Sequence, residues 1–227
     1  MPVFRLQSDA VFPDPELAEN NGLIGIGGDL SQERLIAAYS TGIFPWYSEG
    51  QPILWFSPDP RMVLKLEDFK LSKSLDRMVK SKKFEVKIDT AFKKVIQACS
   101  INSRKDQDGT WITQAMIGAY ETLHQSGIAH SFETYKDGLL VGGLYGVSLG
   151  RGFFGESMFY KERDASKVAF ASLVAFCSEH GFDFIDAQTP SKHLASLGAK
   201  EIPRRQFLDM LRATLERDSL LGDWGNI

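Results

Sequence analysis

The clearest pattern along the chain is an alternation of apolar and polar residues, in which short turns of Asp, Gly and Ser separate three alternating runs. A period of two is typical of strands, because successive side chains point to opposite faces of a sheet. We therefore predict a three-stranded antiparallel meander over residues 131–135, 139–147 and 151–159. A mainly apolar helix over 165–180 and a short strand over 182–188 are expected to follow it.

Elsewhere, apolar residues recur every three or four positions, which is the spacing of an amphipathic helix. Ser31, Ser72, Asp89 and Asp164 are expected as N-caps, and Pro203 as a first helical residue. The remaining helices are predicted over residues 32–40, 73–80, 90–100 and 114–125, and from 203 onward. Two further strands are predicted over residues 61–66 and 84–88, and a polar loop over 102–109.

The first 60 residues have little regular pattern and are rich in proline, glycine and aromatic residues. Trp46 and Trp55 lie among four prolines, which predicts a rigid, extended loop with large aromatic surfaces. Such a loop serves either for packing between domains or as a wall that faces a substrate. The glycines between Gly22 and Gly28 favour tight turns over a phosphate-binding loop, because the G-x-G-x-x-G spacing is missing.

Composition places the chain among ordinary globular proteins. Its 227 residues are 43% hydrophobic and 24% charged, with a formal net charge of −3. We predict a mixed α/β chain of the α+β class, with a small domain over residues 1–60 and a larger one over 61–227. Cys99 and Cys177 are too few for a disulfide framework, no signal peptide is evident, and no apolar run reaches ~18 residues. A cytoplasmic protein without a membrane partner is expected.

A cluster of cations contrasts with this balanced charge. Lys73, Arg77 and Lys80 fall on one face of the predicted helix over 73–80, and Lys82 and Lys83 extend that face. No acidic residue is expected between them on that side. The cluster is therefore either a solvated helix face or a surface that contacts the phosphates of a nucleic acid.

Three polar side chains interrupt segments that are otherwise apolar enough for buried strands. Glu156 lies in the third strand of the meander, and Asp186 and Gln188 lie two residues apart in the strand after the helix. Asp186 and Gln188 are therefore expected on one face of that strand. A buried polar group without a partner costs about 1–3 kcal/mol. The three residues form either a hydrogen-bonded core network or a functional site.

Several chemistries are disfavoured. The histidines show no metal-ligand spacing, Ser157 lacks a G-x-S-x-G context, and Cys177 lies on an apolar helix face, so we expect no metal and no covalent intermediate. The order of meander, helix, strand and helix resembles the core of GNAT-type acyltransferases. However, the junction at 163–168 has no glycine and carries Asp164, which would repel the pyrophosphate of acetyl-CoA. Another acyl donor is expected in the groove.

The separate motifs of the chain resemble those of one family. They are Gly27-Gly-Asp-Leu, Gly42-Ile-Phe-Pro-Trp, Ile53-Leu-Trp, Ser57-Pro-Asp-Pro-Arg61, Gly109-Thr-Trp-Ile-Thr113, Val141-Gly-Gly-Leu-Tyr-Gly146, Gly155-Glu-Ser-Met-Phe159, Ala195-Ser-Leu-Gly-Ala199 and Glu201-Ile-Pro-Arg-Arg205. In this order, from about residue 10 to residue 210, the sequence is similar to the leucyl/phenylalanyl-tRNA–protein transferase family.

This resemblance implies an enzyme that moves leucine or phenylalanine, with methionine as a third candidate, from tRNA to proteins that begin with arginine or lysine. The added residue marks the acceptor for degradation by the N-degron pathway. The resemblance also implies a small N-terminal domain before a GNAT-like domain, and we expect a monomer. Because an aminoacyl ester is already activated, no cofactor is expected. Alignment of the amine with the ester can supply up to about 7–11 kcal/mol.

The resemblance also suggests roles for individual residues. Asp186 and Gln188 are expected to handle the attacking amine, with Asp186 orienting Gln188 and accepting a proton through it, and Glu156 is expected to hold substrate. Because an amide is a poor base, the proton is expected to go to Asp186 or to the departing ribose oxygen. A pocket for the donor side chain is expected from Phe153, Met158, Ile185, Leu144, Phe170 and Leu173.

The tRNA itself is expected to contact a second set of residues. Trp46 and Trp111 would stack on its terminal adenosine. The cations expected to hold its acceptor stem are Lys73, Arg77, Lys80, Lys82 and Lys83. Two other functions stay open at this point: a GNAT-like N-acetyltransferase that uses acetyl-CoA, and a non-catalytic tRNA-binding protein or degradation adaptor that would not need Asp186.

Overall fold

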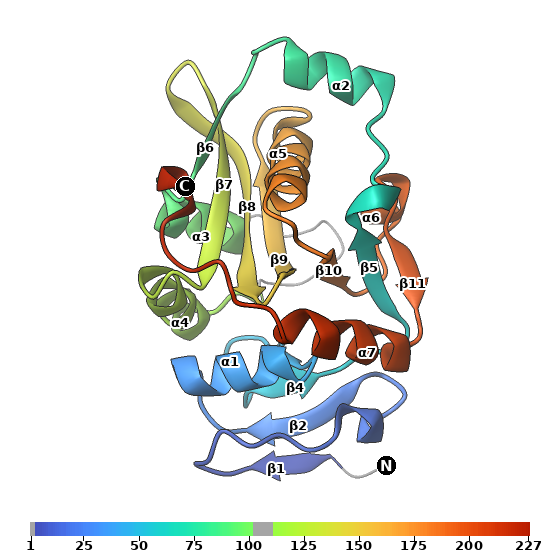
Figure 1. Cartoon of the computed structure of the whole chain (residues 1–227). Coiled ribbons are helices and arrows are strands. Elements are labelled where there is room, and N and C mark those ends of the chain that lie inside the picture. Colours follow the sequence, from blue (N-terminus) through green and yellow to red (C-terminus); the bar gives the residue numbers. More distant parts are fainter. Residues whose placement is uncertain (1–2, 102–110) are drawn as a thin grey trace.

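Two sheets organise the computed structural model of the chain, which describes residues 3–101 and 111–227. A small four-stranded sheet lies at one end, and a seven-stranded sheet with helices on both faces forms the rest (Figure 1). The predicted mixed α/β class is confirmed. The polar loop expected over 102–109 lies outside the described residues.

The small sheet has the strand order β1-β2-β4-β3, with β1 and β2 parallel and the other pairs antiparallel. Its elements are β1 (Phe4–Leu6), β2 (Leu23–Gly27), β3 (Phe44–Pro45) and β4 (Leu54–Phe56), and helix α1 (Gln32–Ser40) follows β2. The glycines expected only in turns thus form a strand, and Gly22, Gly27 and Gly28 have positive φ around its ends. Trp55 is buried in this sheet, and its indole N–H donates to the Gly27 carbonyl at 2.9 Å.

The large sheet has the order β11-β5-β10-β9-β8-β7-β6. Its strands are β5 (Arg61–Lys65), β6 (Glu85–Ile88), β7 (Ala129–Lys136), β8 (Leu139–Leu149), β9 (Gly152–Tyr160), β10 (Phe184–Gln188) and β11 (Lys200–Ile202). The predicted meander is β7, β8 and β9, and it is antiparallel. Among these strands only β9 and β10 pair in parallel, because a helix joins them.

Helices flank the large sheet. They are α2 (Lys73–Lys80), α3 (Phe92–Ile101), α4 (Gln114–Gln125), α5 (Ala165–Glu179), α6 (Lys192–Ser196) and α7 (Arg204–Leu215), with short 3₁₀ turns at Pro15–Leu17, Leu66–Asp68 and Trp224–Asn226. Ser31 and Ser72 cap α1 and α2 as predicted, each accepting from the backbone N–H three residues ahead. The prediction for Pro203 was wrong by one residue, since Pro203 is the N-cap and α7 begins at Arg204.

Neither of the two aspartates predicted as N-caps makes a side-chain capping hydrogen bond, although Asp164 does occupy the N-cap position of α5. Asp89 and Asp164 both have a left-handed backbone, with φ of 57° and 67°. α3 begins only at Phe92, and the Asp89 carboxylate instead accepts from Ser131 N–H and binds His130 Nδ1, each at 2.8 Å. The Asp164 carboxylate makes no capping hydrogen bond and instead binds Lys167. In both cases a long-range or side-chain partner replaces the helix N–H groups.

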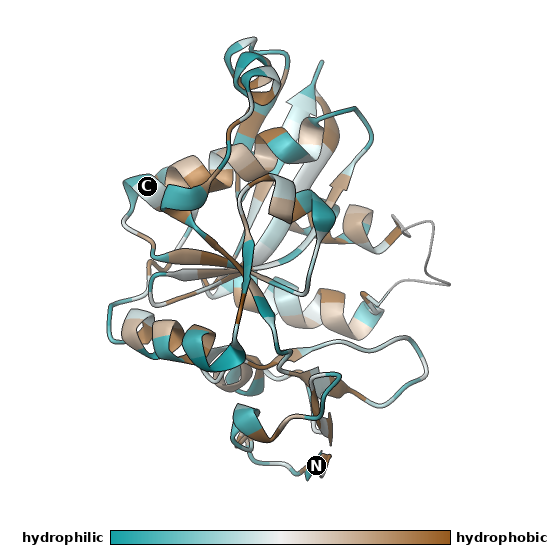
Figure 2. Cartoon of the chain, turned by 90° about the vertical axis from the view of Figure 1, so that its right-hand side faces the viewer, coloured by the Kyte–Doolittle hydropathy of each residue, from teal (hydrophilic) through white to brown (hydrophobic). Residues whose placement is uncertain are grey.

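Successive residues of the central strands enter different apolar cores. Leu144 and Phe153 pack in the core that contains α5, whereas their neighbours Tyr145 and Phe154 pack in the core that contains α1, α3, α4 and α7. This alternation is the expected result of the strand period, and it places α5 on the opposite face of the sheet from α1, α3, α4 and α7. In Figure 2 the strands are mostly white to brown, and the teal residues lie mainly on outer helix faces and loops.

The parallel pair β9 and β10 is in register for only three residues. Pairing runs from Phe184 opposite Gly152 to Asp186 opposite Phe154 and then stops, although β9 continues to Tyr160. On the other side of β10, its register with β5 shifts between Asp186 and Gln188. The two strands therefore separate at their C-terminal ends and leave an opening in the sheet.

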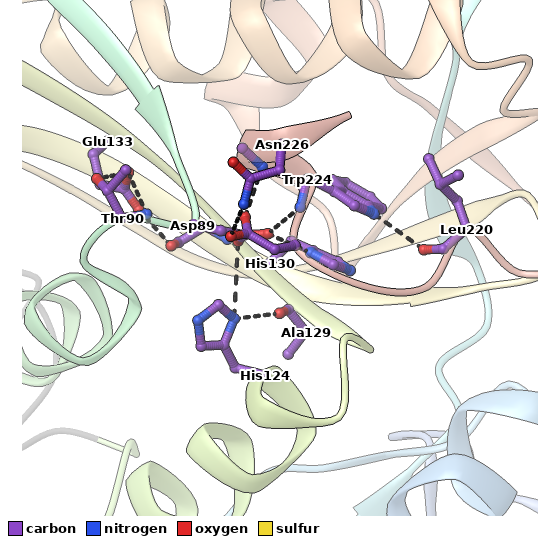
Figure 3. A network of polar contacts seen from close by, with 12 residues as sticks. Asp89, Thr90, His124, Ala129, His130, Glu133, Leu220, Trp224 and Asn226 are labelled. Atoms are coloured by element: carbon purple, nitrogen blue, oxygen red, sulfur yellow. Dashed lines mark hydrogen bonds and ion pairs between the residues drawn. The ribbon is translucent and has the colours of Figure 1, made fainter.

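A second polar network fixes the segment after α7 to the sheet (Figure 3). Trp224 stacks on His130 with ring centroids 3.6 Å apart, and its backbone N–H donates to Asp89. The indole also packs 6.0 Å from the ring of Phe153. We call Asp89, His130 and Trp224 the clasp. It holds the end of the chain against the core that lies beneath α5.

None of the helices within residues 3–101 and 111–227 combines the length and the hydropathy that a membrane crossing requires. The division of the chain into domains at residue 60 stays a prediction.

Candidate active site

A cavity of about 660 Å³ opens where β9 and β10 separate. Eleven of the residues singled out from the sequence line it: Trp46, Trp111, Leu144, Phe153, Glu156, Met158, Phe170, Leu173, Ile185, Asp186 and Gln188. Because the sheet is open at this point, the cavity reaches side chains from both faces. It joins an apolar wall to a polar end.

The apolar wall contains all six residues predicted for a side-chain pocket. β8 supplies Leu144, β9 supplies Phe153 and Met158, β10 supplies Ile185, and α5 supplies Phe170 and Leu173. Apart from Met158, they are almost fully buried. A pocket of this kind can hold an unbranched or γ-branched apolar side chain, and methionine adapts to either shape.

Asp186 lies at the polar end and is clamped by Arg61. The guanidinium donates to both carboxylate oxygens, with Nη2 to Oδ2 at 2.6 Å and Nε to Oδ1 at 3.0 Å, and both side chains are fully buried. Arg61 also donates to the Gly42 carbonyl at 3.1 Å, and it lies over the rings of Phe44 and Phe207. Both Asp186 oxygens are therefore engaged in charge-assisted hydrogen bonds, which fix the position of this side chain.

Gln188 contacts the other two polar residues in different ways. Its backbone N–H donates to Asp186 Oδ1 at 2.8 Å, whereas its side-chain Nε2 donates to Glu156 Oε1 at 2.7 Å. The expected orientation of Gln188 by Asp186 therefore acts through the main chain, since the described hydrogen bonds include none between the two side chains. The backbone of Gln188 is left-handed, with a φ of 63°, and this turns the amide toward Glu156.

Two buried tyrosines complete the surroundings of Glu156. Tyr39 from α1 donates to Oε1 at 2.6 Å, Tyr120 from α4 donates to Oε2 at 3.1 Å, and the two hydroxyls also contact each other. Burial raises the pKa of Glu156 from 4.5 to about 7, while the hydrogen bonds from Tyr39, Gln188 and Tyr120 oppose that rise. Glu156 can thus change its protonation state near neutral pH.

The mouth of the cavity carries aromatic and charged groups. Trp46 is 37% exposed, and Trp111 lies on the same cavity lining. Arg163, Asp164 and Lys167, from the start of α5, also line it, with Lys167 Nζ 3.0 Å from the Asp164 carboxylate. Asp164 lies at the start of α5 as the sequence indicated, but Arg163 and Lys167 both pair with its carboxylate, so the expectation against acetyl-CoA stays a prediction.

None of the five cations predicted to hold tRNA lines the cavity; Lys73, Arg77, Lys80, Lys82 and Lys83 lie on α2 or just after it. The expectation that their side lacks acidic residues was wrong. Asp76 pairs with Lys80 at 2.8 Å, and Glu162, which follows β9, lies 3.6 Å from Lys83. Asp76 lies one helical turn from Lys80, and Glu162 comes from a different part of the chain, so the spacing of the cations along the helix does not reveal either acid.

Sequence reasoning missed the residues that support the polar end. Tyr39 and Tyr120 look like ordinary core positions of amphipathic helices, and nothing in the pattern separates them from Leu35 or Leu123. Arg61 belonged to a family motif, Ser57-Pro-Asp-Pro-Arg61, but its charge in a buried strand was a signal of its own. A buried arginine requires a nearby anion, and Asp186 was the candidate.

Comparison with known proteins places the chain in a family. The model of the leucyl/phenylalanyl-tRNA protein transferase family matches residues 63–212, and the model of its N-terminal domain matches residues 28–59. A leucyl/phenylalanyl-tRNA–protein transferase of Desulfatibacillum aliphaticivorans is 57% identical, covering 99% of this chain and 96% of its own length. One of Anaeromyxobacter sp. (strain Fw109-5) is 51% identical, with coverages of 99% and 95%.

Among solved structures, FemX is similar with a TM-score of 0.50 and 11% identity, over 79% of this chain and 70% of that one. This likeness concerns the fold alone. The family models and the curated relatives, by contrast, identify the sequence directly. The chain belongs to the leucyl/phenylalanyl-tRNA protein transferase family.

Proposed function

We propose that this protein transfers leucine, phenylalanine or methionine from aminoacyl-tRNA to proteins whose first residue is arginine or lysine. One observation carries the proposal beyond family membership. The cavity joins a buried apolar wall to the polar group of Glu156, Asp186 and Gln188. The donor side chain would enter the wall, and its ester carbonyl would then lie near the polar end.

The polar end would align the acceptor amine with this ester. Since Gln188 uses its Nε2 on Glu156, its amide oxygen is left to accept a hydrogen bond from the amine. Asp186 and Arg61 hold the strand that carries Gln188, so their part is to position it. The reaction needs no cofactor, because the ester is activated and alignment alone can contribute up to about 7–11 kcal/mol.

The tRNA would occupy the mouth of the cavity. Trp46 and Trp111 would stack on the terminal adenosine, and stacking on an aromatic side chain contributes about 1–3 kcal/mol per base. The acceptor stem would reach the cations of α2, among which Lys73, Arg77 and Lys82 have no acidic partner in the described ion pairs. Arg163, at the mouth itself, is a further candidate because its side chain is 94% exposed.

A transfer assay tests the proposal. Purified protein is incubated with labelled leucyl-tRNA and a peptide that begins with arginine, and the label on the peptide is measured. A peptide with an acetylated N-terminus serves as the negative control, since it offers no nucleophilic amine. Gln188→Ala should lower transfer strongly, whereas Asp209→Asn, in an exposed ion pair on α7, should not. Absence of label with intact protein and charged tRNA would contradict the proposal.

The same protein also allows the alternatives to be tested. An N-acetyltransferase would bind acetyl-CoA tightly in a calorimetric titration. A non-catalytic adaptor would keep its function in Asp186→Ala as long as that variant stays folded, which circular dichroism checks, because the substitution leaves Arg61 buried without its counter-charge. We expect neither result, because Asp164 lies at the helix start and Asp186 is built into the polar end.

Three coarser features belong to the same proposal. Two domains divided at residue 60, a monomer, and a location in the cytoplasm, where aminoacyl-tRNA is present, are the expected setting of the reaction. Light scattering coupled to gel filtration would measure the mass of the particle. A mass near that of a single 25.4 kDa chain is the expected result.

A further inference from the structure

The proposed transfer requires a group that takes a proton from the acceptor. An N-terminal amino group has a pKa of about 7.7–8.0, so at neutral pH most of it is an ammonium that cannot attack. Asp186 is poorly suited to receive the proton, because the Arg61 guanidinium, a permanent cation, donates to both of its oxygens. The partners of Glu156, by contrast, are two phenol hydroxyls and an amide, which carry no charge. The Gln188 amide is a poor base. Among the three polar residues this leaves Glu156, which lines the same cavity.

The two tyrosine hydroxyls beside Glu156 do not carry enough hydrogens for all the hydrogen bonds that the three residues make with one another. The oxygens of Tyr39, Tyr120 and the Glu156 carboxyl make three mutual contacts, at 2.5, 2.6 and 3.1 Å. Each contact needs one hydrogen between two oxygens, and the two phenols bring only two. A protonated Glu156 supplies the third. One of the three hydrogen bonds among Tyr39, Tyr120 and Glu156 therefore forms when Glu156 gains a proton and is lost when Glu156 releases it.

The surroundings of Glu156 keep the tyrosines themselves out of this exchange. Burial raises the pKa of both phenols well above the usual value, so each retains its hydrogen. Other titratable or charged groups face Glu156 from the packed elements or share its cavity: Tyr145 on β8, Cys99 on α3, Asp186 with Arg61, Arg163, Asp164 and Lys167 by α5, and His193 on α6. Burial raises the pKa of Tyr145 and of Cys99 as well, so these stay neutral.

We propose that Glu156 accepts the proton that the attacking ammonium loses, and that Tyr39 and Tyr120 are positioning residues for this exchange. This inference rests on the proposed aminoacyl transfer. The ammonium gives one proton to the Glu156 carboxylate and becomes a neutral amine. The amine nitrogen then forms the new C–N bond, the ester C–O bond breaks, and the second N–H proton passes to the departing ribose oxygen. Glu156 afterwards releases its proton to water.

Rates of transfer measured against pH test the proposal. Initial rates are taken for the wild type, Tyr39→Phe, Tyr120→Phe and Glu156→Gln across the range around pH 7, and ester hydrolysis without protein is subtracted. Tyr47→Phe is the matched control, because it removes a buried phenol hydroxyl that contacts Thr113 instead of Glu156. The amine titrates identically with every variant, so a shift between variants reports the protein alone.

The hydrogen bonds from Tyr39 and Tyr120 favour the ionised carboxyl, so removing either one should raise the pKa of Glu156. The acidic limb of the rate profile should then move to higher pH by about one unit in both variants. Tyr47→Phe should match the wild type. Glu156→Gln should lose this limb and be slower by about 10²-fold or more.

Carbon NMR of labelled glutamate carboxyls gives a second readout that does not depend on activity. The signal that is missing in Glu156→Gln should titrate near pH 7 in the wild type and higher in Tyr120→Phe. A signal that titrates near 4.5, profiles of Tyr39→Phe and Tyr120→Phe that match Tyr47→Phe, or an unchanged rate in Glu156→Gln would each overturn the proposal. A wild type that transfers nothing at any pH would contradict the proposed function itself.

Discussion

Gln188 has a backbone conformation that its sequence gives no reason to expect. A left-handed non-glycine residue costs of order 1–3 kcal/mol and persists only where the surrounding structure enforces it. Here the register shift beside Asp186 and the hydrogen bond to its carboxylate enforce it. Asp186 and Gln188 were predicted to share one face of the strand, but they contact different partners. Asp186 binds Arg61, and Gln188 binds Glu156. Strain at this position is an expected cost of an active site.

At the same scale, replacing Glu156 by Gln should stabilise the fold at alkaline pH. The folded carboxyl keeps its proton up to pH about 7, whereas the unfolded one loses it near 4.5. The stability linked to that proton is thus fully present below 4.5 and lost as pH rises through 7. A glutamine, which mimics the protonated acid, removes this loss, so the variant should gain up to about 3 kcal/mol at pH 8.

Urea denaturation at pH 8 and pH 5 would measure this gain. At pH 5 the two proteins should differ much less, because wild-type Glu156 is then protonated. Equal stabilities at pH 8 would show that the wild-type carboxyl is ionised without penalty.

Asp186→Asn should destabilise the protein by about 3–5 kcal/mol, because it leaves Arg61 buried without its counter-charge. Adding Arg61→Met to it should recover part of that loss, since the double variant buries no unpaired charge. The midpoints of denaturant unfolding compare the three proteins. Asp209→Asn, which breaks an exposed pair with Arg212, should lower the stability less than Asp186→Asn does. Equal losses of stability in these two single variants would contradict the argument that the buried pair matters more.

On helix α2, acidic side chains nearby neutralise some of the cations that the sequence pattern groups together. The spacing of its cations was evident from the sequence, but Asp76 is one turn from Lys80 and binds it at 2.8 Å. Glu162, which follows β9, lies 3.6 Å from Lys83 although the two residues are far apart in the sequence. The free positive charge of this face therefore rests mainly on Lys73, Arg77 and Lys82.

Salt dependence separates these cations. If they contact phosphates, Lys73→Gln and Lys82→Gln should each reduce the slope of log K for tRNA binding against log salt by roughly one. Lys80→Gln should change the slope less, because Asp76 already neutralises Lys80. Binding titrations at several salt concentrations measure the slopes. Unchanged slopes in all three variants would make α2 an ordinary solvated helix.

On the scale of the whole molecule, the clasp links the segment after α7 to the apolar wall of the cavity. Trp224 packs against Phe153 of the apolar wall, and Asp89 holds both Trp224 and His130. Burial lowers the pKa of His130 despite the neighbouring Asp89. When the pH falls below 6.5, the usual pKa of histidine, His130 therefore takes up a proton more readily in the unfolded chain than in the folded one. The free energy of unfolding that depends on His130 falls as the pH falls.

His130→Asn should therefore lose less stability than the wild type when the pH is lowered from 7 to 5. Glu156 and Glu133, whose pKa values are raised by burial, contribute with the opposite sign in both proteins, so only the difference between them is informative. Thermal or urea unfolding at the two pH values measures this difference. An identical pH dependence would exclude His130 as a contributor.

How much the sequence predicted depends on the range of the interactions. The meander, the caps at Ser31 and Ser72, and the six apolar wall residues follow from local periodicity, capping chemistry and the resemblance to a family. Asp89 shows the limit, because its partners His130 and Trp224 are more than 40 residues away and outcompeted a local cap. Tyr39 and Tyr120 show the same limit, because the role of a hydroxyl on a buried helix face becomes clear only when its partner, Glu156, is known.

The contacts of Arg61 and Tyr39 have a consequence for how this protein can evolve. Arg61 connects Asp186 to the Gly42 carbonyl, and Tyr39 contacts Glu156, so residues on both sides of position 60 share one polar group. A recombination event at that position would combine a tyrosine from one lineage with a carboxyl from another. The two segments should therefore be exchanged together or not at all, although two separate family models match them. Compensating substitutions should cross the boundary together.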